Sequence, residues 1–192
     1  MINKIVTITV IILMLLACNQ NNNEAKPDIK TKDTSNIYPL NVMLDNQIMD
    51  LQRSPYYIYK KTIVNDKVAD SVPFPIDSLA KVIQYFKTFN IDTAGKKEFY
   101  TESSFKDLST NSISLVYTTT NPAMEVINQT ILLNEETNEL KNAFVRIIKK
   151  NTNQQIQYNF KPNKSLRIST IKLNDGKQEI IEKVIINWND TE

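Results

Sequence analysis

Residues 154–160 read "QQIQYNF", and apolar and polar side chains alternate along this stretch. Successive side chains of a β-strand point to opposite faces, so Ile156, Tyr158 and Phe160 share one face. Gln157 and its polar neighbours share the other face. Such alternation is typical of a strand in a sheet with one buried and one wet face. We therefore expect the Tyr158 side to face the core and the Gln157 side to face solvent.

The same period of two continues on both sides of this strand. It predicts strands at Lys97–Ser104, Ser112–Thr119, Glu125–Leu133, Leu140–Lys150, Gln154–Phe160, Ser165–Leu173 and Gln178–Trp188. The short polar links between them force consecutive strands to be antiparallel neighbours. Asp175-Gly176 is the strongest hairpin signal, because a type I′ turn needs positive φ at both central residues. The sequence thus predicts a seven-stranded antiparallel meander.

Two helices and a hairpin are predicted before the meander. Apolar residues recur at helical spacing from Leu40 to Leu51, and Ser54-Pro55 ends that run. Tyr56–Val64 and Val68–Val72 read as a hairpin around a turn at Asn65–Lys67. A second helix follows Asp77, a plausible N-cap, with Leu79, Val82, Ile83 and Phe86 on its apolar face. We predict an α+β fold in which two helices pack on a curved, mostly antiparallel sheet, an open-barrel-like meander.

Apolar residues near the middle of the meander lie on both faces of their strands. Val145 and Ile147 alternate with Phe144 and Ile148, which is more apolar surface than we expect two short helices to cover. Arg146 lies among them, either as an anion site or with its stem on apolar neighbours and its head in water. Val145, Ile147 and Arg146 therefore mark an expected ligand or partner face. Scattered exposure of apolar side chains is the alternative.

The chain begins with an apolar run that leads to its only cysteine, in "ILMLLACNQNNN" from Ile12 to Asn23. The run is too short to cross a bilayer as a helix and has the length of a secretory h-region. Leu15–Cys18 resembles the bacterial lipobox. The resemblance implies a signal peptide over residues 1–17, cleavage between Ala17 and Cys18, and diacylglycerol and acyl chains on Cys18. The alternative is an ordinary secretory signal with an accidental cysteine.

Residues 19–36, "NQNNNEAKPDIKTKDTSN", contain almost no large apolar side chain. Such a segment cannot repay the entropy of ordering, so we expect lipidated Cys18 and a disordered tether over residues 18–36 and one globular domain over 37–192. The tether has no polybasic patch for anionic lipid. It also lacks the acid-rich stretch that follows the cysteine in many surface-exported lipoproteins. This favours the periplasmic side of the outer membrane.

Composition excludes several classes of function. Removing residues 1–17 removes Lys4 and no acid, which leaves 22 basic and 21 acidic residues, so nucleic acid is not an expected partner. Two isolated glycines exclude a P-loop and a dinucleotide-binding fingerprint. With no histidine and the only cysteine in the lipobox, we expect no His-dependent triad, no metal site and no cofactor.

Glu98 and Glu102 form the best carboxylate pair in the domain. Both would point to one face of a strand, with their backbones about 13 Å apart. Glycosidase carboxyl groups lie roughly 5–9.5 Å apart, so we expect both side chains to be solvated. The sequence does not favour an enzyme.

The order of lipobox, tether, helix, Tyr/Thr-rich hairpin, second helix and long antiparallel run resembles a group of uncharacterised Bacteroidota-type outer-membrane lipoproteins. More loosely, it resembles the open barrels of lipoprotein carriers and receptors, which hold acyl chains on a concave face. Three tripeptides also match the short Asp-Ser/Thr-apolar acceptor of envelope O-glycosylation in such bacteria: Asp70-Ser71-Val72, Asp77-Ser78-Leu79 and Asp92-Thr93-Ala94.

Two functions remain as expectations. The first is a non-enzymatic, lipid-anchored envelope protein that binds a protein or another envelope component. The second is a carrier that shelters a lipid or other apolar ligand in its curved sheet. Trp188 and the tyrosines at 56, 57 and 59 would then line a groove, or otherwise pack in the core.

Overall fold

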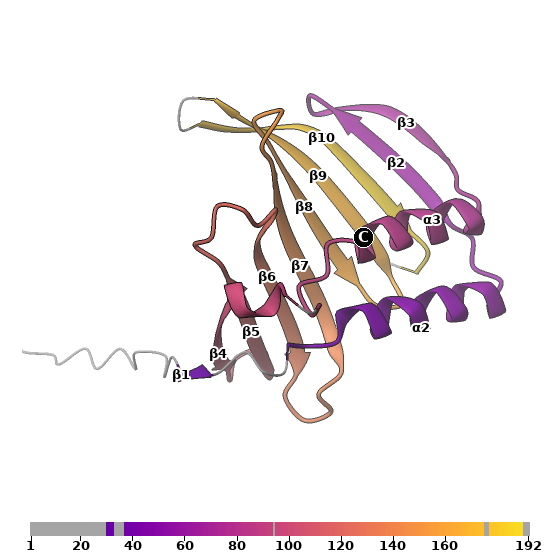
Figure 1. Cartoon of the computed structure of the whole chain (residues 1–192). Coiled ribbons are helices and arrows are strands. Elements are labelled where there is room, and N and C mark those ends of the chain that lie inside the picture. The colour runs from indigo at the N-terminus through magenta and orange to yellow at the C-terminus, as the bar shows by residue number, and fades with distance from the viewer. Residues whose placement is uncertain (1–29, 33–36, 94, 175–176, 190–192) are drawn as a thin grey trace, which may run out of the picture.

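The computed structural model describes residues 30–32, 37–93, 95–174 and 177–189 (Figure 1). Its helices are α2 (Leu40–Arg53), α3 (Ile76–Lys87) and the short 3-10 helix η2 (Lys97–Phe99). Its strands are β1 (Lys30–Lys32), β2 (Tyr59–Val64), β3 (Lys67–Pro73), β4 (Thr101–Asp107), β5 (Ser112–Thr118), β6 (Val126–Asn134), β7 (Leu140–Lys149), β8 (Gln154–Lys161), β9 (Ser165–Asn174) and β10 (Lys177–Asn187).

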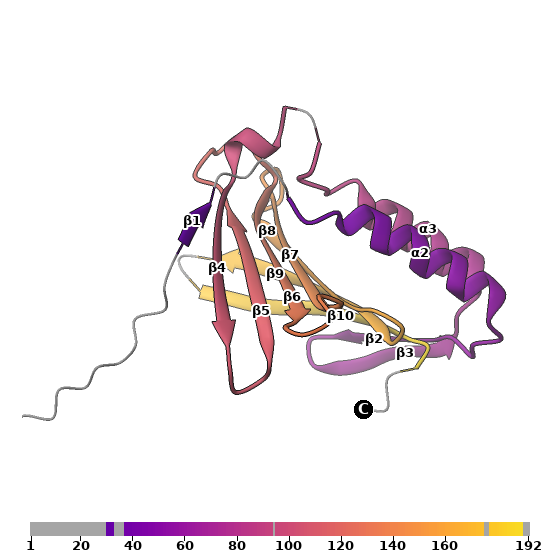
Figure 2. The same ribbon diagram turned by 90° about the horizontal axis from the view of Figure 1, so that it is seen from below.

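The strands form one antiparallel sheet in the order β1-β4-β5-β6-β7-β8-β9-β10-β2-β3. Strands β4 to β10 follow one another along the chain, which confirms the predicted meander and the α+β fold class. The β2–β3 hairpin precedes the meander in sequence but pairs beside β10, at the far end (Figure 1). The sheet is curved and does not close on itself (Figure 2).

Helices α2 and α3 lie side by side over the concave face of the sheet, which we call the inner face (Figure 2). The buried residues of α2 and α3 pack there against the strands. The Phe86 ring stacks on the Tyr158 ring at 4.6 Å between centroids, and Phe160 is fully buried. The Tyr158 side of β8 is therefore the core side, as predicted. The opposite, outer face carries no helix among the described residues.

Asparagines make most of the tight turns. Asn65, Asn111, Asn138, Asn153 and Asn163 have positive φ, as does Asp66. Asn and Asp tolerate the left-handed region better than other non-glycine residues. They serve where a chain with only two glycines needs that conformation. The predicted Asn65–Lys67 turn is confirmed, and Asp175-Gly176 lies outside the described residues.

Three local predictions differ from the structure. Pro75, not Asp77, precedes the first residue of α3, and Asp77 lies in the first turn, where the helix dipole favours a carboxylate. Lys97–Phe99 form η2 instead of the start of a strand. In Ser165–Leu173 the apolar set switches from Leu166 and Ile168 to Ile171 and Leu173, which predicts a bulge in this strand. The register shift lies instead in the partner strand, between Ile180 and Glu182 of β10.

The amino-terminal segment is described only at β1. Ala17 and Cys18, with the predicted signal peptide, lie outside the described residues. Within the expected tether, residues 30–32 pair with β4, Lys30 opposite Ser104 and Lys32 opposite Glu102. The open edge of β4 offers unpaired backbone groups, and these can pair with an extended segment that lacks apolar side chains.

No helix in the described part of the chain is long and apolar enough to cross a membrane.

Candidate functional site

The structure separates the three residues of the predicted ligand face. Val145 and Ile147 lie on the inner face opposite Tyr158 and Ile156 of β8, and both are buried in the core. Arg146 lies on the outer face and is exposed. The side chains of Val145 and Ile147 thus belong to the core, and Arg146 lies on the opposite face of the same strand.

A pocket lies where the carboxyl end of α3 meets the ends of β6 and β7. Its volume is about 650 Å³, and a smaller pocket of about 130 Å³ adjoins it. The larger one is lined by Tyr85, Thr88, Phe89, Ala123, Glu125, Ile147, Lys149, Lys150, Asn151 and Thr152. Thr88, Phe89, Ala123 and Glu125 line both pockets. We call the combined space the end pocket.

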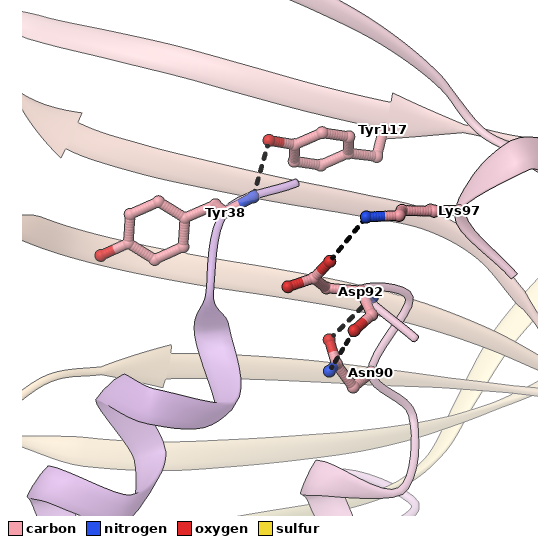
Figure 3. Close-up of polar contacts among 5 residues, drawn as sticks. All are labelled: Tyr38, Asn90, Asp92, Lys97 and Tyr117. Atoms are coloured by element: carbon pink, nitrogen blue, oxygen red, sulfur yellow. Dashed lines mark hydrogen bonds and ion pairs between the residues drawn. The ribbon is translucent and has the colours of Figure 1, made fainter. Parts of the chain in front are cut away.

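The loop that follows α3 forms one wall of the end pocket, and local hydrogen bonds hold it. The Asn90 carboxamide oxygen accepts a hydrogen bond from the Asp92 backbone N–H at 3.0 Å, and Lys97 Nζ lies 3.9 Å from an Asp92 carboxylate oxygen (Figure 3). These contacts keep the fully buried Ile91 in place between them. The wall is therefore a shaped feature of the fold.

Two tyrosine hydroxyls fix neighbouring segments to the sheet. The Tyr100 hydroxyl donates to the Val126 carbonyl at 2.7 Å, and burial raises the pKa of Tyr100 to about 12. The Tyr38 backbone N–H donates to the Tyr117 hydroxyl at 3.1 Å (Figure 3). Burial raises the pKa of Tyr117, and the nearby Glu102 carboxylate raises it further. Both tyrosines stay neutral at physiological pH.

The charges around the end pocket are mostly positive. Lys96, Lys149 and Lys150 line it, and Glu125 is the single carboxylate among its described lining residues. The described residues contain no group of three or more His, Cys, Asp and Glu side chains placed to hold a metal ion. The lining therefore suits binding of an anionic or amphiphilic group.

The predicted carboxylate pair is not on one strand. Glu98 lies exposed in η2, whereas Glu102 lies on the inner face of β4, opposite Tyr117. Glu102 is only 8% exposed, so the expectation that both carboxylates are solvated is wrong for Glu102. Glu102 interacts with the buried Tyr117 hydroxyl, which also accepts the Tyr38 backbone N–H, and the strand pattern does not reveal this contact.

A second pocket, of about 180 Å³, lies on the outer face of β6 to β8. It is lined by Asn128, Thr130, Phe144, Val145, Arg146, Gln157 and Tyr158. We call it the outer-face pocket. Two of its lining residues, Val145 and Arg146, belong to the ligand face expected from the sequence. The sequence did not indicate the others, because amide and hydroxyl side chains on a wet face carry no specific signal. Phe144, an aromatic side chain on the same face as Arg146, could have indicated this pocket.

The remaining candidates divide between core and surface. Trp188 is buried in the core, whereas Tyr57 is exposed. In the three possible acceptor tripeptides, Ser71 and Thr93 are exposed and Ser78 is half-buried.

Comparison of the chain with protein-family models, with curated proteins and with solved structures finds no match.

Proposed function

We propose that this protein is a lipid-anchored, non-enzymatic binding protein of the outer membrane, facing the periplasm. Its domain captures a protein or another envelope component at the end pocket. The observation that carries the proposal is the end pocket itself, because its volume falls within the range of about 300–1,000 Å³ that is common for binding sites.

The lining of the end pocket supports binding more than catalysis. Phe89 and Ile147, both buried, provide an apolar floor, and lysines surround the opening. Acid–base or nucleophilic catalysis needs titratable groups that converge on one point. Glu125 is exposed and is the single carboxylate lining this pocket in the described part of the chain.

A carrier of an apolar ligand is the second candidate. Ile147 and Phe89 belong to the core and also line the end pocket, so an acyl chain that entered would contact the core directly. The centre of the inner face is occupied by the Phe86–Tyr158 stack and by Phe160. Any such ligand would therefore bind at the end pocket and not along the whole sheet.

A pocket-filling variant tests both candidates. Ala123 is exposed and lines both parts of the end pocket, so Ala123→Trp should fill the space without disturbing the core. Ala69→Trp, on an exposed position of β3, is the matched control. We expect native mass spectrometry of protein taken from its own membrane to show a retained partner or ligand in the wild type and in Ala69→Trp, but not in Ala123→Trp.

The retained mass distinguishes the two candidates. A polypeptide or other large envelope component supports the binding module, and a small apolar molecule supports the carrier. Equal retention by Ala123→Trp, or no retained mass in the wild type, contradicts binding at the end pocket.

The anchor is tested separately. We expect the membrane-derived protein to partition into detergent and to begin at Cys18 with the added mass of diacylglycerol and acyl chains. A Cys18→Ala variant should lack that mass. An unmodified Cys18 in membrane-derived protein contradicts the anchor.

A further inference from the structure

All charged residues of the central strands are basic. Strands β6, β7, β8 and β9 contain no Asp or Glu, although the chain has 21 acidic residues. The same strands carry six basic residues: Lys141, Arg146, Lys149, Lys161, Arg167 and Lys172. These residues do not share one face: Lys149 lines the end pocket, whereas Arg146 lies on the outer face. On the outer face, the absence of carboxylates from these strands means that they do not repel an anionic ligand near Arg146.

On the outer face, two rows of side chains cross these strands. In one row, Arg146 lies between Asn128 of β6 and Gln157 of β8. In the neighbouring row, Phe144 lies between Thr130 and Asn159. The outer-face pocket lies between the two rows, with an aromatic ring on one side and a guanidinium on the other.

The side chains of this pocket are available for a ligand. Phe144 is 42% exposed, which is high for an aromatic ring in the middle of a sheet. Arg146 is exposed and has no ion-pair partner among the described residues.

We propose that the outer face of β6–β8 binds a saccharide chain that carries carboxylate groups. Amide and hydroxyl side chains donate to and accept from sugar hydroxyls, and the guanidinium of Arg146 matches a carboxylate with two parallel hydrogen bonds. The ring of Phe144 offers a flat apolar surface to the C–H face of a sugar. This site lies on the side of the sheet away from α2 and α3 (Figure 2), so it is separate from the end pocket.

The chemistry favours a saccharide over two other anionic partners. Single-stranded nucleic acid is bound by several aromatic rings that stack on successive bases. The outer-face pocket has one exposed ring, and neutral polar side chains outnumber its cations. A lipid surface is gripped by clusters of lysine and arginine, whereas Arg146 is the single cation lining this pocket.

The test uses the full-length protein in detergent micelles and two soluble probes. Oligogalacturonate has a carboxylate on each sugar, and maltohexaose has none. We expect saturable binding of oligogalacturonate. Arg146→Gln should weaken it by about tenfold or more, the loss typical of one charge-assisted hydrogen bond. Phe144→Leu should also weaken it, because it removes the flat ring that faces the sugar. Maltohexaose should bind more weakly than oligogalacturonate to the wild type.

Matched controls lie on the same face. Phe105 on β4 is also 42% exposed, so Phe105→Leu removes an equal ring outside the pocket. Lys61 lies on the outer side of β2, opposite Ile185, so Lys61→Gln removes an equal charge. Both controls should change the affinity by less than twofold, and thermal unfolding should show that all four variants are folded.

Several results would overturn the proposal. One is the absence of saturable oligogalacturonate binding, and another is an equal loss of affinity in the control variants. A third is tighter binding of a single-stranded oligonucleotide or of anionic vesicles, if the same pocket variants abolish that binding. The site is distinguishable from the end pocket, because Ala123→Trp should leave oligogalacturonate binding unchanged.

Discussion

The inner and outer faces of β6–β9 are built from alternate residues of the same strands, and their chemistry is opposite. On the inner face, Val145, Tyr158 and Phe160 are buried against the helices. On the outer face, Arg146, Gln157 and Asn159 occupy the positions between them. The core of these strands thus lies on one face, and the other face keeps polar and charged side chains.

The largest expected effect tests this division directly. Phe160 is fully buried, so Phe160→Ala should lower the free energy of unfolding by about 3–5 kcal/mol, through lost burial and the cavity left behind. Gln157→Ala, on the outer face of the same strand, should change it by less than about 0.5 kcal/mol. Equilibrium unfolding in denaturant measures both. Similar losses for the two variants would contradict the assignment of faces.

The inner face should also respond to alkaline pH. Burial raises the pKa of Tyr100 to about 12 from its ordinary value of 10.0, and raises those of Tyr117 and Tyr158 as well. Between pH 10 and about 12, these tyrosines lose their protons in the unfolded chain but keep them in the folded chain. Stability should therefore be complete below pH 10 and fall as pH rises, by on the order of 2 kcal/mol from Tyr100 alone at pH 12.

Tyrosinate absorbance and urea unfolding between pH 9 and 12 give the measurement. Tyr100→Phe should reduce the pH dependence, because it removes one of the shifted groups. An unchanged profile in that variant would contradict the role given to Tyr100.

A smaller effect concerns Gln129, a polar side chain that is buried on the inner face. Gln129 is 0% exposed, and both polar atoms of its carboxamide lack a partner. Gln129→Leu should raise the free energy of unfolding by about 1–2 kcal/mol, since an unpaired buried polar group costs about that much. Gln47→Leu is the contrasting control, because the Gln47 carboxamide oxygen accepts the Asn163 backbone N–H at 2.6 Å. Loss of this hydrogen bond in Gln47→Leu should destabilise the domain. If Gln129→Leu also destabilises the domain, the Gln129 carboxamide has a hydrogen-bond partner and the prediction is wrong.

The smallest expected effect is the coupling energy between two aromatic rings, one on a helix and one on the sheet. Phe86 of α3 and Tyr158 of β8 stack at 4.6 Å with an interplanar angle of 13°. A double-mutant cycle with Phe86→Leu and Tyr158→Leu should give a coupling of about 0.5–1.5 kcal/mol. Additive effects would mean that area burial alone joins α3 to the inner face.

The strand pattern was sufficient to predict the meander, because a period of two and short polar links leave few alternatives. It also identified the inner side of β8 and the apolar faces of both helices. It could not place the β2–β3 hairpin beside β10, because that pairing joins Tyr59 to Asn187 across most of the chain. Long-range pairing leaves no local signal.

The candidate sites were much less predictable. Val145 and Ile147 read as surplus apolar surface, yet both side chains are buried in the core. The end pocket depends on how the loop after α3 folds, and its contacts, such as Tyr100 with Val126, join distant positions. Arg146 and Phe144 line one pocket only because the strand register places them in neighbouring rows on the outer face.

Pairing of β1 with β4 has a geometric consequence for a protein held by lipid at Cys18. A fully extended chain from Cys18 to Ile37 reaches about 65 Å, whereas from Cys18 to Lys30 it reaches only about 40 Å. If Cys18 carries the proposed lipid, the pairing shortens the free segment between the lipid and the domain and makes the β4 edge the point of attachment.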